Sequence, residues 1–481
     1  MDMFDQFIIA GEIGKNLDDT FSPFIQHVLE SRELPGLAVG IVSDNEIVYA
    51  RGFGVRSIKT REPISMTTIF HMASVSKPFV ATGIVQLIEQ GRVQLDAPIT
   101  AALPYFKLDD DRYRDITIQQ MLSHVSGMPD VEDYEWDTPQ YDEGALERYV
   151  RSVSSKKLLF EPGGKFAYSN MAFECLGDVI AKVSGIPFDD YVKKHILDPA
   201  GMAESSFLKS EHLPGNWAAP HVRLLADLAW EGYPYNRMHG PSSTLHSSAV
   251  EMCNWAITNL NRGNFQGNKI LSPSSYELLW KPWAEISEGE QVGLSWFLGE
   301  YRGEKIIEHG GGDIGFRTHF VMLPDKRAAA VVLCNLGPAP VEEITHAALD
   351  VILGYEPGPI APDASILICK TLLEEGLDAA VAQWASLRSD HPDEYDFSLG
   401  QFDSLYDAIS LERAEDAERI ACLYARILPE TDVKAIEDLA AGRQNKAAAA
   451  VLRAIREYRK GVRKGDGEDY VNSAIESRHA E

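Results

Sequence analysis

Strand-like segments stand at both ends of the first 350 residues, and a long helical stretch separates them. Near the start, residues 37–44 and 46–57 are rich in β-branched and aromatic side chains and flank the turn-forming pair Asp44-Asn45, which predicts a β-hairpin. The strand pattern returns later in four segments, residues 293–301, 304–308, 316–323 and 328–335. We therefore expect one antiparallel sheet built from both ends, with residues 78–255 forming an inserted helical lobe.

A segment with three prolines, Gly354–Pro362, indicates a linker. The expected division is a first domain at 1–355, a linker at 356–362 and a helical C-terminal domain at 363–481. In the last of these, segments 373–384 and 414–424 each combine a small residue, an aromatic residue and a following proline, a pattern that resembles a degenerate tetratricopeptide repeat. The expected fold class is α/β (α+β), with helices flanking the sheet, followed by an all-α domain.

The chain is strongly acidic. It carries 72 Asp and Glu against 45 Lys and Arg, a formal net charge of −27. Nucleic-acid recognition requires a basic surface, so this balance argues against nucleic acid, and also against anionic membranes. Five cysteines without C-x-x-C spacing are typical of reduced thiols. The N-terminus lacks the basic region of a signal peptide, and no apolar run approaches the ~18 residues of a membrane helix. We expect a cytoplasmic protein.

Several common catalytic motifs are absent from the sequence. There is no G-x-S-x-G, no H-E-x-x-H and no phosphate-binding P-loop. The run Gly310–Gly315 matches G-x-G-x-x-G in letters, but it leads into a predicted strand rather than a helix. A dinucleotide site at this position is therefore not expected.

The pattern Ser-x-x-Lys occurs at Ser74, Ser154 and Ser206, and only its surroundings distinguish the three. Ser74 lies where a strand-like segment gives way to an apolar helix, with Lys77 one turn later on the same helix face. A serine hydroxyl is a weak nucleophile unless a neighbouring base takes its proton. A lysine can be that base when burial lowers its pKa. The start of a helix between two lobes provides this burial, which favours Ser74 and Lys77.

Two further motifs follow in the chain. Tyr-x-Asn occurs at Tyr168–Asn170 after a turn-rich approach; a second copy at 470–472 lies in the terminal segment and is discounted. The sequence His309-Gly-Gly-Gly312 ends one predicted strand and precedes another, and its glycines allow the backbone to approach a ligand closely.

Other conspicuous residues have ordinary structural explanations. We expect His71 and His124 to make structural hydrogen bonds, Trp296 to lie in the core or the cleft wall, and Cys334 to be inert in a buried strand. Three residues on a predicted cleft loop are weaker candidates for substrate contact: Tyr235, Met238 and His239.

The order of these motifs resembles the serine β-lactamase and penicillin-binding-protein superfamily. The resemblance is closest to its class C β-lactamase, family VIII esterase and D-aminopeptidase branch, and it covers residues 20–350. Stretches at 34–40, 122–129 and 309–325 support it. The resemblance implies the fold of that superfamily, an antiparallel sheet flanked by helices with a helical lobe, and it does not extend to the C-terminal domain.

The resemblance also implies roles for individual residues. Ser74 would be the nucleophile, Lys77 its base and Tyr168 a second acid or base that relays the proton to the leaving group. Asn170 would orient Lys77 and the substrate. The backbone N–H groups of Ser74 and Gly312 would form the oxyanion hole. His309 and Gly311 would belong to the substrate-binding strand, and no metal or cofactor is implied.

One departure from the superfamily bears on the substrate. Its Lys-Thr-Gly motif is His309-Gly310-Gly311 here, and a histidine is mostly neutral at pH 7. Without the cation, activity on penicillins or peptidoglycan stems is less expected. The His-x-Gly variant looks like family VIII esterases. We therefore expect a serine hydrolase that acts on small carboxylic esters.

Alternatives remain open. Within hydrolases they are an amidase or D-aminopeptidase, a weak β-lactamase, and an acyltransferase that passes the same acyl-enzyme to an alcohol or amine. From another class, residues 363–481 are a candidate surface for a protein partner or for homo-oligomer formation.

Overall fold

The computed structural model describes residues 7–209, 215–224, 227–229, 232–397, 414–427 and 452. These residues divide into two compact units. The first contains the described residues of Met1–Pro220 and Glu231–Gly358, and the second those of His221–Trp230 and Pro359–Glu481. The described residues of the segment 221–230, which the sequence assigned to the first domain, thus belong to the second unit. The predicted domain boundaries themselves stay a prediction.

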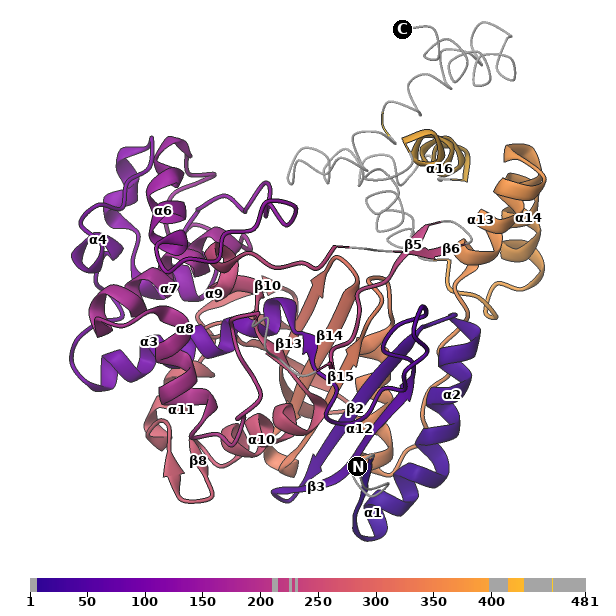
Figure 1. Cartoon of the computed structure of the whole chain (residues 1–481), viewed down its shortest axis with the longest axis horizontal. Helices are drawn as coiled ribbons and strands as arrows, with labels where there is room; N and C mark the ends of the chain where they lie inside the picture. Colours follow the sequence, from indigo (N-terminus) through magenta and orange to yellow (C-terminus); the bar gives the residue numbers. More distant parts are fainter. Residues whose placement is uncertain are drawn as a thin grey trace, which may run out of the picture. The chain divides into compact units, whose positions relative to one another are not determined.

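The first unit is built on a nine-stranded sheet in which every neighbouring pair is antiparallel. The order is β1-β3-β2-β15-β14-β13-β12-β11-β10, so strands from the two ends of the unit meet at the β2–β15 pair (Figure 1). This confirms the prediction of one antiparallel sheet. The strands are β1 (Phe7–Ile9), β2 (Gly36–Ser43), β3 (Glu46–Gly54), β10 (Ala284–Ser287), β11 (Glu290–Val292), β12 (Phe297–Tyr301), β13 (Glu304–Asp313), β14 (Phe316–Leu323) and β15 (Ala328–Cys334).

The hairpin β2–β3 forms as predicted. Asp44 and Asn45 connect it with φ angles of 48° and 68°, the left-handed conformation that a tight hairpin turn requires. Helices α10 (Ala249–Leu260) and α12 (Val341–Leu353) cover opposite faces of the sheet centre: Gly40 faces α10, whereas His319 contacts α12. Burial on both faces explains why β2 is buried along its whole length and carries no polar side chain before Ser43 at its end.

Helices fill the stretch between the early and late strands, as expected, and pack into one core with the sheet. The predicted helix after Ser74 is α3, which ends at Glu89 just before Gly91 takes a left-handed φ of 69°. It packs against α7, where Ser169 caps the first turn. The helices of this unit are α1 (Gly11–Asn16), α2 (Ser22–Ser31), α3 (Lys77–Glu89), α4 (Ile99–Ala102), α5 (Ile118–Leu122), α6 (Ala145–Ser152), α7 (Asn170–Ser184), α8 (Phe188–Val192), α9 (Gly240–Ser243), α10 and α11 (Pro273–Leu279) as well as α12.

Short strand pairs lie within the helical stretch. They are β4 (Phe70–His71) with β7 (His246–Ser247), and β8 (Asn264–Phe265) with β9 (Asn268–Lys269). The first pair matters for the site, because β4 leads directly into the segment that carries Ser74. One late strand also differs from expectation: β13 was predicted to end at residue 308, but it continues to Asp313. The His309–Gly312 run therefore lies inside a strand paired with β14.

The second unit contains α13 (Ala364–Glu374), α14 (Leu377–Asp390) and α16 (Ala414–Ile427), together with the hairpin β5 (Val222–Leu224) and β6 (Asp227–Ala229). The predicted helix at 414–424 is confirmed. The predicted single segment at 373–384 is wrong: Gly376, at φ 90° and ψ 179°, separates α13 from α14. The two strands mean that the unit is not purely helical. The tetratricopeptide likeness stays a prediction, and the terminal segment 453–481 lies outside the described residues.

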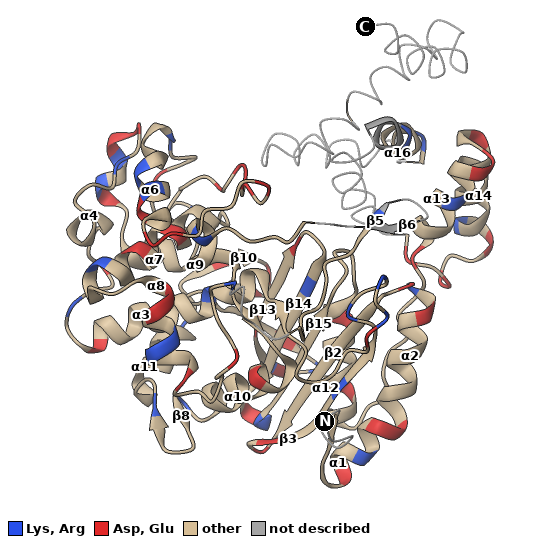
Figure 2. Ribbon diagram, viewed as in Figure 1, with Lys and Arg blue, Asp and Glu red and all other residues tan. Residues whose placement is uncertain are grey.

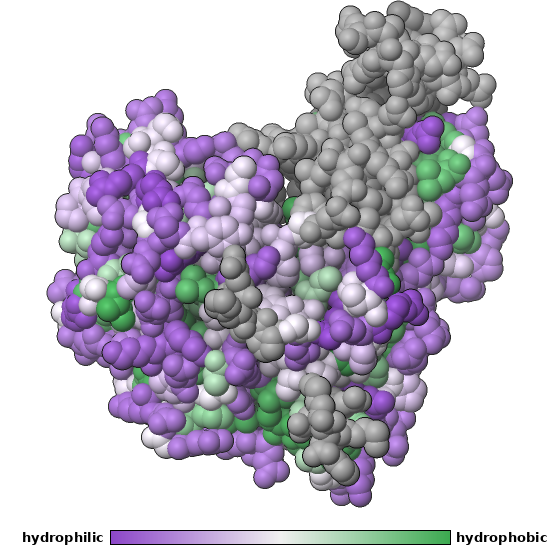
Figure 3. All heavy atoms as spheres, viewed as in Figure 1, coloured by the Kyte–Doolittle hydropathy of each residue, from purple (hydrophilic) through white to green (hydrophobic). Residues whose placement is uncertain are grey.

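Charged residues lie mainly on helices and loops, while the strands of the sheet are mostly uncharged (Figure 2). The face seen in Figure 3 is correspondingly hydrophilic over most of its described area. No helix among the described residues has the length and apolar character needed to cross a bilayer. The cytoplasmic location stays a prediction.

Candidate active site

Ser74 lies in a single 3-10 turn, Ala73–Ser76, between β4 and α3. The preceding residue, Ala73, has a φ of 48°, a left-handed conformation that non-glycine residues rarely adopt and that clusters at functional sites. The turn is fixed by Met72, whose carbonyl oxygen accepts a hydrogen bond from Thr318 Oγ1 at 2.8 Å and whose N–H donates to Leu245 at 2.7 Å. The serine is therefore held on a rigid support between β14 and the lobe.

Lys77 is the first residue of α3 and is fully buried. Its Nζ donates hydrogen bonds to Ser74 Oγ and to the carbonyl oxygen of Ser242, both at 2.9 Å. Burial lowers the pKa of Lys77 to about 7, although the charges of Glu174, Asp130 and Asp313 oppose this by favouring the ammonium. At neutral pH a substantial fraction of the amine is therefore uncharged and can accept the serine proton.

Tyr168 stands just before α7 with its hydroxyl hydrogen-bonded to Ser74. Its ring stacks on His124, with centroids 4.2 Å apart, and the Lys77 Nζ lies 4.9 Å from the ring centroid. Burial raises the pKa of Tyr168 well above its ordinary value of 10, and the hydrogen bond with Ser74 only partly offsets this. The phenol is consequently neutral at physiological pH. It is therefore placed to donate a proton and is not a permanently ionised phenolate base.

Both histidines expected to be structural make fixed hydrogen bonds. His124 Nδ1 accepts from the backbone N–H of Ser169 at 3.1 Å, and burial lowers its pKa well below 6.5, so the ring is neutral. His71 contacts Asp313 through Nε2 at 3.2 Å. His124 thus aligns the ring of Tyr168, which stacks on it.

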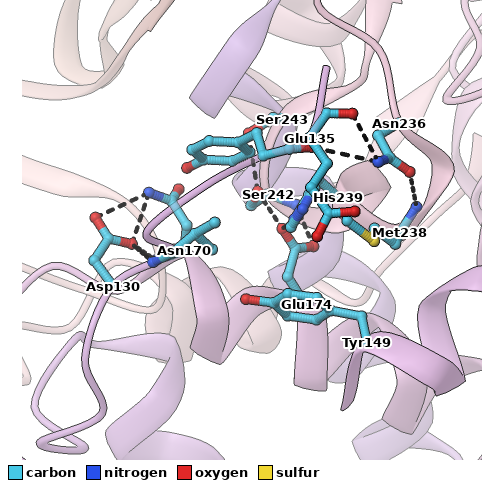
Figure 4. Close-up of polar contacts among 12 residues, drawn as sticks. Asp130, Glu135, Tyr149, Asn170, Glu174, Asn236, Met238, His239, Ser242 and Ser243 are labelled. Atoms are coloured by element: carbon cyan, nitrogen blue, oxygen red, sulfur yellow. Dashed lines mark hydrogen bonds and ion pairs between the residues drawn. The ribbon is translucent and has the colours of Figure 1, made fainter. Parts of the chain in front are cut away.

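Asn170, the first residue of α7, is tied to Asp130 rather than to Lys77. Its backbone N–H donates to Asp130 Oδ1 at 2.7 Å, and its Nδ2 donates to both carboxylate oxygens at 3.0 and 3.2 Å (Figure 4). This clamp leaves Oδ1 of Asn170 buried without a hydrogen-bond partner among the described residues. The described residues show no direct hydrogen bond between Asn170 and Lys77, so the orientation of Lys77 and the substrate by Asn170 stays a prediction.

The glycines after His309 bring β13 against the serine turn. A Cβ atom on Gly311 would lie 2.3 Å from the Met72 carbonyl oxygen and 3.2 Å from the Ser74 nitrogen, so only glycine fits there. On the other strand face, a Cβ on Gly312 would meet the guanidinium of Arg317 at 2.1 Å. The close approach of the two backbones suits the predicted oxyanion hole, while the assignment of the Gly312 N–H to it stays a prediction.

The face of β13 that carries Gly311 also carries the imidazole of His309 and the carboxylate of Asp313. His309 is buried, and its Nδ1 donates to the carbonyl of Gly310 at 2.7 Å. Burial, reinforced by Lys77, lowers the pKa of His309 to about 3. Four residues later Asp313 occupies the same face and accepts a hydrogen bond from Trp136 Nε1 at 3.2 Å. No cation stands where the superfamily motif has its lysine.

Three carboxylates near Lys77 were not identified from the sequence: Asp130, Glu174 and Asp313. Only Glu174 left a local signal, because it interrupts the apolar run Met171–Leu176 on a helix that is buried along most of its length. The three weaker candidates for substrate contact, Tyr235, Met238 and His239, are all buried and contact neighbouring side chains instead. Trp296 and Cys334 are fully buried, in agreement with the sequence.

Comparison with known proteins shows which family this chain resembles. The family model described as Beta-lactamase matches residues 21–354. Protein flp of Staphylococcus aureus strain MW2 is 25% identical over 329 residues, covering 67% of this chain and 64% of its own length. Penicillin-binding protein 4* of Bacillus subtilis strain 168 is 26% identical over 306 residues, covering 60% and 66%. The chain thus spans less than two thirds of these relatives.

Two solved structures are also similar. The octameric penicillin-binding protein homologue from Pyrococcus abyssi aligns with a TM-score of 0.62 and 27% identity, covering 76% of this chain and 82% of that one. A penicillin-binding protein from Bacillus halodurans gives 0.55 and 25%, covering 69% and 97%. Because the family model covers well over half of the chain, this protein belongs to the β-lactamase family, within the serine β-lactamase and penicillin-binding-protein superfamily.

Proposed function

We propose that this protein is a serine hydrolase that cleaves small carboxylic esters through an acyl-enzyme on Ser74. The observation that carries the proposal is the 2.9 Å contact between Ser74 Oγ and the Nζ of a fully buried lysine whose pKa falls to about 7. This chemistry requires a nucleophile paired with a base of which a substantial fraction is uncharged at working pH.

The proton path follows from the three side chains. Ser74 Oγ bonds to the substrate carbonyl carbon, and its proton passes to the neutral amine of Lys77. As the bond to the leaving alcohol breaks, the Tyr168 phenol gives its proton to that oxygen and recovers one from the Lys77 ammonium. Water then attacks the acyl carbon, loses a proton to the restored base, and Ser74 leaves with a proton. The N–H groups of Ser74 and Gly312 are proposed to hold the oxyanion in both steps.

The charges around the site favour a neutral acyl donor. His309 remains uncharged, and Asp313 presents a carboxylate on the same strand face. A substrate carboxylate at this end of the site would meet a negative charge instead of the superfamily's lysine. Small uncharged esters avoid that repulsion.

The test is hydrolysis of p-nitrophenyl acetate and butyrate by the wild-type protein and by Ser74→Ala. We expect the variant to keep its fold and to lose activity by about 10³-fold or more. Intact-mass measurement of the wild type should find one acyl group on Ser74. Full activity in Ser74→Ala would disprove the proposal.

A second candidate activity is hydrolysis of amino-acid amides that carry a free ammonium group. Asp313 favours it, because its carboxylate lies on the same face of β13 as His309, close enough for its charge to act on Lys77, and a carboxylate there attracts a cationic acyl part. Comparing kcat/KM for neutral esters, D-amino-acid amides and nitrocefin separates esterase, aminopeptidase and β-lactamase. Adding alcohols or amines as acceptors tests acyl transfer.

The similar protein from Pyrococcus abyssi is described as octameric. Self-association of this chain is a proposal that light scattering of the full chain tests. Binding of a protein partner through residues 363–481 is a separate proposal. A monomer at micromolar concentration would exclude the first.

A further inference from the structure

A buried hydrogen-bond network connects Lys77 to Glu174 through Ser242. Lys77 Nζ donates to the carbonyl oxygen of Ser242 at 2.9 Å. Ser242 in turn donates twice to Glu174, from its hydroxyl to Oε1 at 2.6 Å and from its backbone N–H to Oε2 at 3.2 Å (Figure 4). One residue, Ser242, therefore holds the base with its carbonyl and the glutamate with its other two polar groups.

The glutamate end of the network is closed to water. Glu174 and His239 are both fully buried, and Nδ1 of His239 donates to Glu174 Oε1 at 3.1 Å. Three aromatic rings pack edge-on against His239 at 4.8, 5.8 and 4.8 Å between centroids; they are Tyr134, Trp136 and Tyr149. A charge enclosed in this way is not screened by salt and acts on its neighbours through a low dielectric.

The local fold explains why Ser242 needs this support. It lies in α9, a single turn of four residues, Gly240–Ser243, which is too short to fix its own peptide groups through a helical ladder. Glu174 is on α7, a helix of 15 residues that packs against both α3 and α9. Two hydrogen bonds from a rigid helix thus hold the short turn in place, with its carbonyl facing Lys77.

We propose that Glu174 is a positioning residue for Lys77: it holds the Ser242 carbonyl against the amine and supplies a fully buried negative charge. The inference rests on the proposed role of Lys77 as the base. It concerns a glutamate that acts through Ser242 and by its charge, without contact to the substrate.

The sign of the effect follows from the groups that face Lys77. These are Glu174 and Tyr168 from the α7 segment, Asp130 and His124 from the preceding loops, and His309 and Asp313 from β13. Tyr168, His124 and His309 are neutral, so the three carboxylates carry the charge. Glu174 raises the pKa of Lys77 more than Asp130 or Asp313 does. Neutralising Glu174 should therefore lower that pKa.

The direct test measures the titration of Lys77 in the full chain, without substrate. NMR of ¹³C-labelled lysine ε-methylene groups gives the midpoint, and the Lys77→Met variant identifies the signal. We expect Glu174→Gln to lower the midpoint by about one pH unit. The matched control is Glu251→Gln. Glu251 is a buried glutamate on α10 that accepts from Ser205 Oγ at 2.5 Å and from the backbone of Glu204, and it is not among the carboxylates that raise the pKa of Lys77.

Two further variants keep the test decisive if Glu174→Gln does not fold. Glu174→Met removes the charge without leaving a buried amide unpaired, and it should lower the midpoint in the same direction. Glu174→Asp keeps the charge and should return the midpoint toward the wild-type value. A midpoint that is unchanged or raised in the charge-free variants would overturn the inference.

Kinetics give the second readout. In Glu174→Gln the acid limb of kcat/KM for p-nitrophenyl acetate should move to lower pH together with the NMR midpoint, while Glu251→Gln leaves it in place. If the wild type shows no Ser74-dependent hydrolysis, the proposed function fails, yet the NMR midpoints still decide whether Glu174 controls Lys77.

Discussion

The backbone of Gly311 lies directly against that of Ser74: a Cβ atom on Gly311 would stand 3.2 Å from the Ser74 nitrogen and 2.3 Å from the carbonyl oxygen of Met72. The strand and the nucleophile turn are therefore in backbone contact, with no side chain between them. Thr318, on the paired strand, fastens the same turn through its hydrogen bond to Met72.

Gly311→Ala should impair catalysis more than stability. The added methyl group forces β13 away from the serine turn and widens the predicted oxyanion hole, so we expect kcat to fall by about 10²-fold or more. Gly299→Ala on β12 is the control, because its Cβ would meet only Ile306 at 3.5 Å, an ordinary contact. Steady-state kinetics and thermal melts decide; equal activity in both variants would contradict the prediction.

Lys77→Met should stabilise the fold while abolishing activity. The pKa of Lys77 is about 7 in the folded chain and about 10.5 when the chain is unfolded, so the unfolded state binds more protons between these values. The free energy of unfolding of the wild type therefore decreases as the pH falls from 10.5 to 7. The variant has no Lys77 amine to protonate, so its stability does not decrease for this reason. The gain in Tm over the wild type should grow as the pH falls through this window and then level off. A Tm difference independent of pH would argue against a buried neutral lysine.

The rate of ester hydrolysis should rise with pH through about 7 and stay level up to pH 9. The rise reflects loss of the Lys77 proton, and Tyr168 adds no alkaline decline in this range because burial raises the pKa of its phenol. Tyr168→Phe should lower kcat by about 10²-fold without moving the acid limb much. An acid limb near pH 4 in the wild type would point to a carboxylate base instead.

Asp313→Asn should shift specificity toward anionic substrates. The substitution removes a negative charge from the strand face of His309 while an oxygen remains to accept from Trp136. We expect the kcat/KM ratio of nitrocefin to p-nitrophenyl acetate to rise by about tenfold at a pH on the plateau. Asp325→Asn, which neutralises an exposed carboxylate in the turn between β14 and β15, should leave the ratio unchanged.

Much of the framework could be predicted from the sequence because local signals specify it. Asp44-Asn45 sets the β2–β3 hairpin, the apolar spacing after Ser74 sets α3, and Gly91 marks its end. The order of the motifs also indicated that Ser74, Lys77 and Tyr168 form one group of candidate site residues. Local signals failed where a tertiary partner overrode them: pairing with β14 carries β13 through three glycines to Asp313, although glycines usually weaken a strand.

What only the tertiary structure decided is the electrostatic setting of that group. Glu174, Asp130 and Asp313 are 53 to 236 positions from Lys77 in the sequence. In the fold the charges of all three carboxylates raise the pKa of the Lys77 amine. Ser242, 165 positions away, provides one of its two hydrogen bonds. The sequence by itself determined which residues are the candidates for the chemistry, through residue type and local spacing. Burial and Coulomb interaction depend on distances in space, so the protonation of Lys77, the neutrality of His309 and the clamp on Asn170 became defined only once the chain had folded.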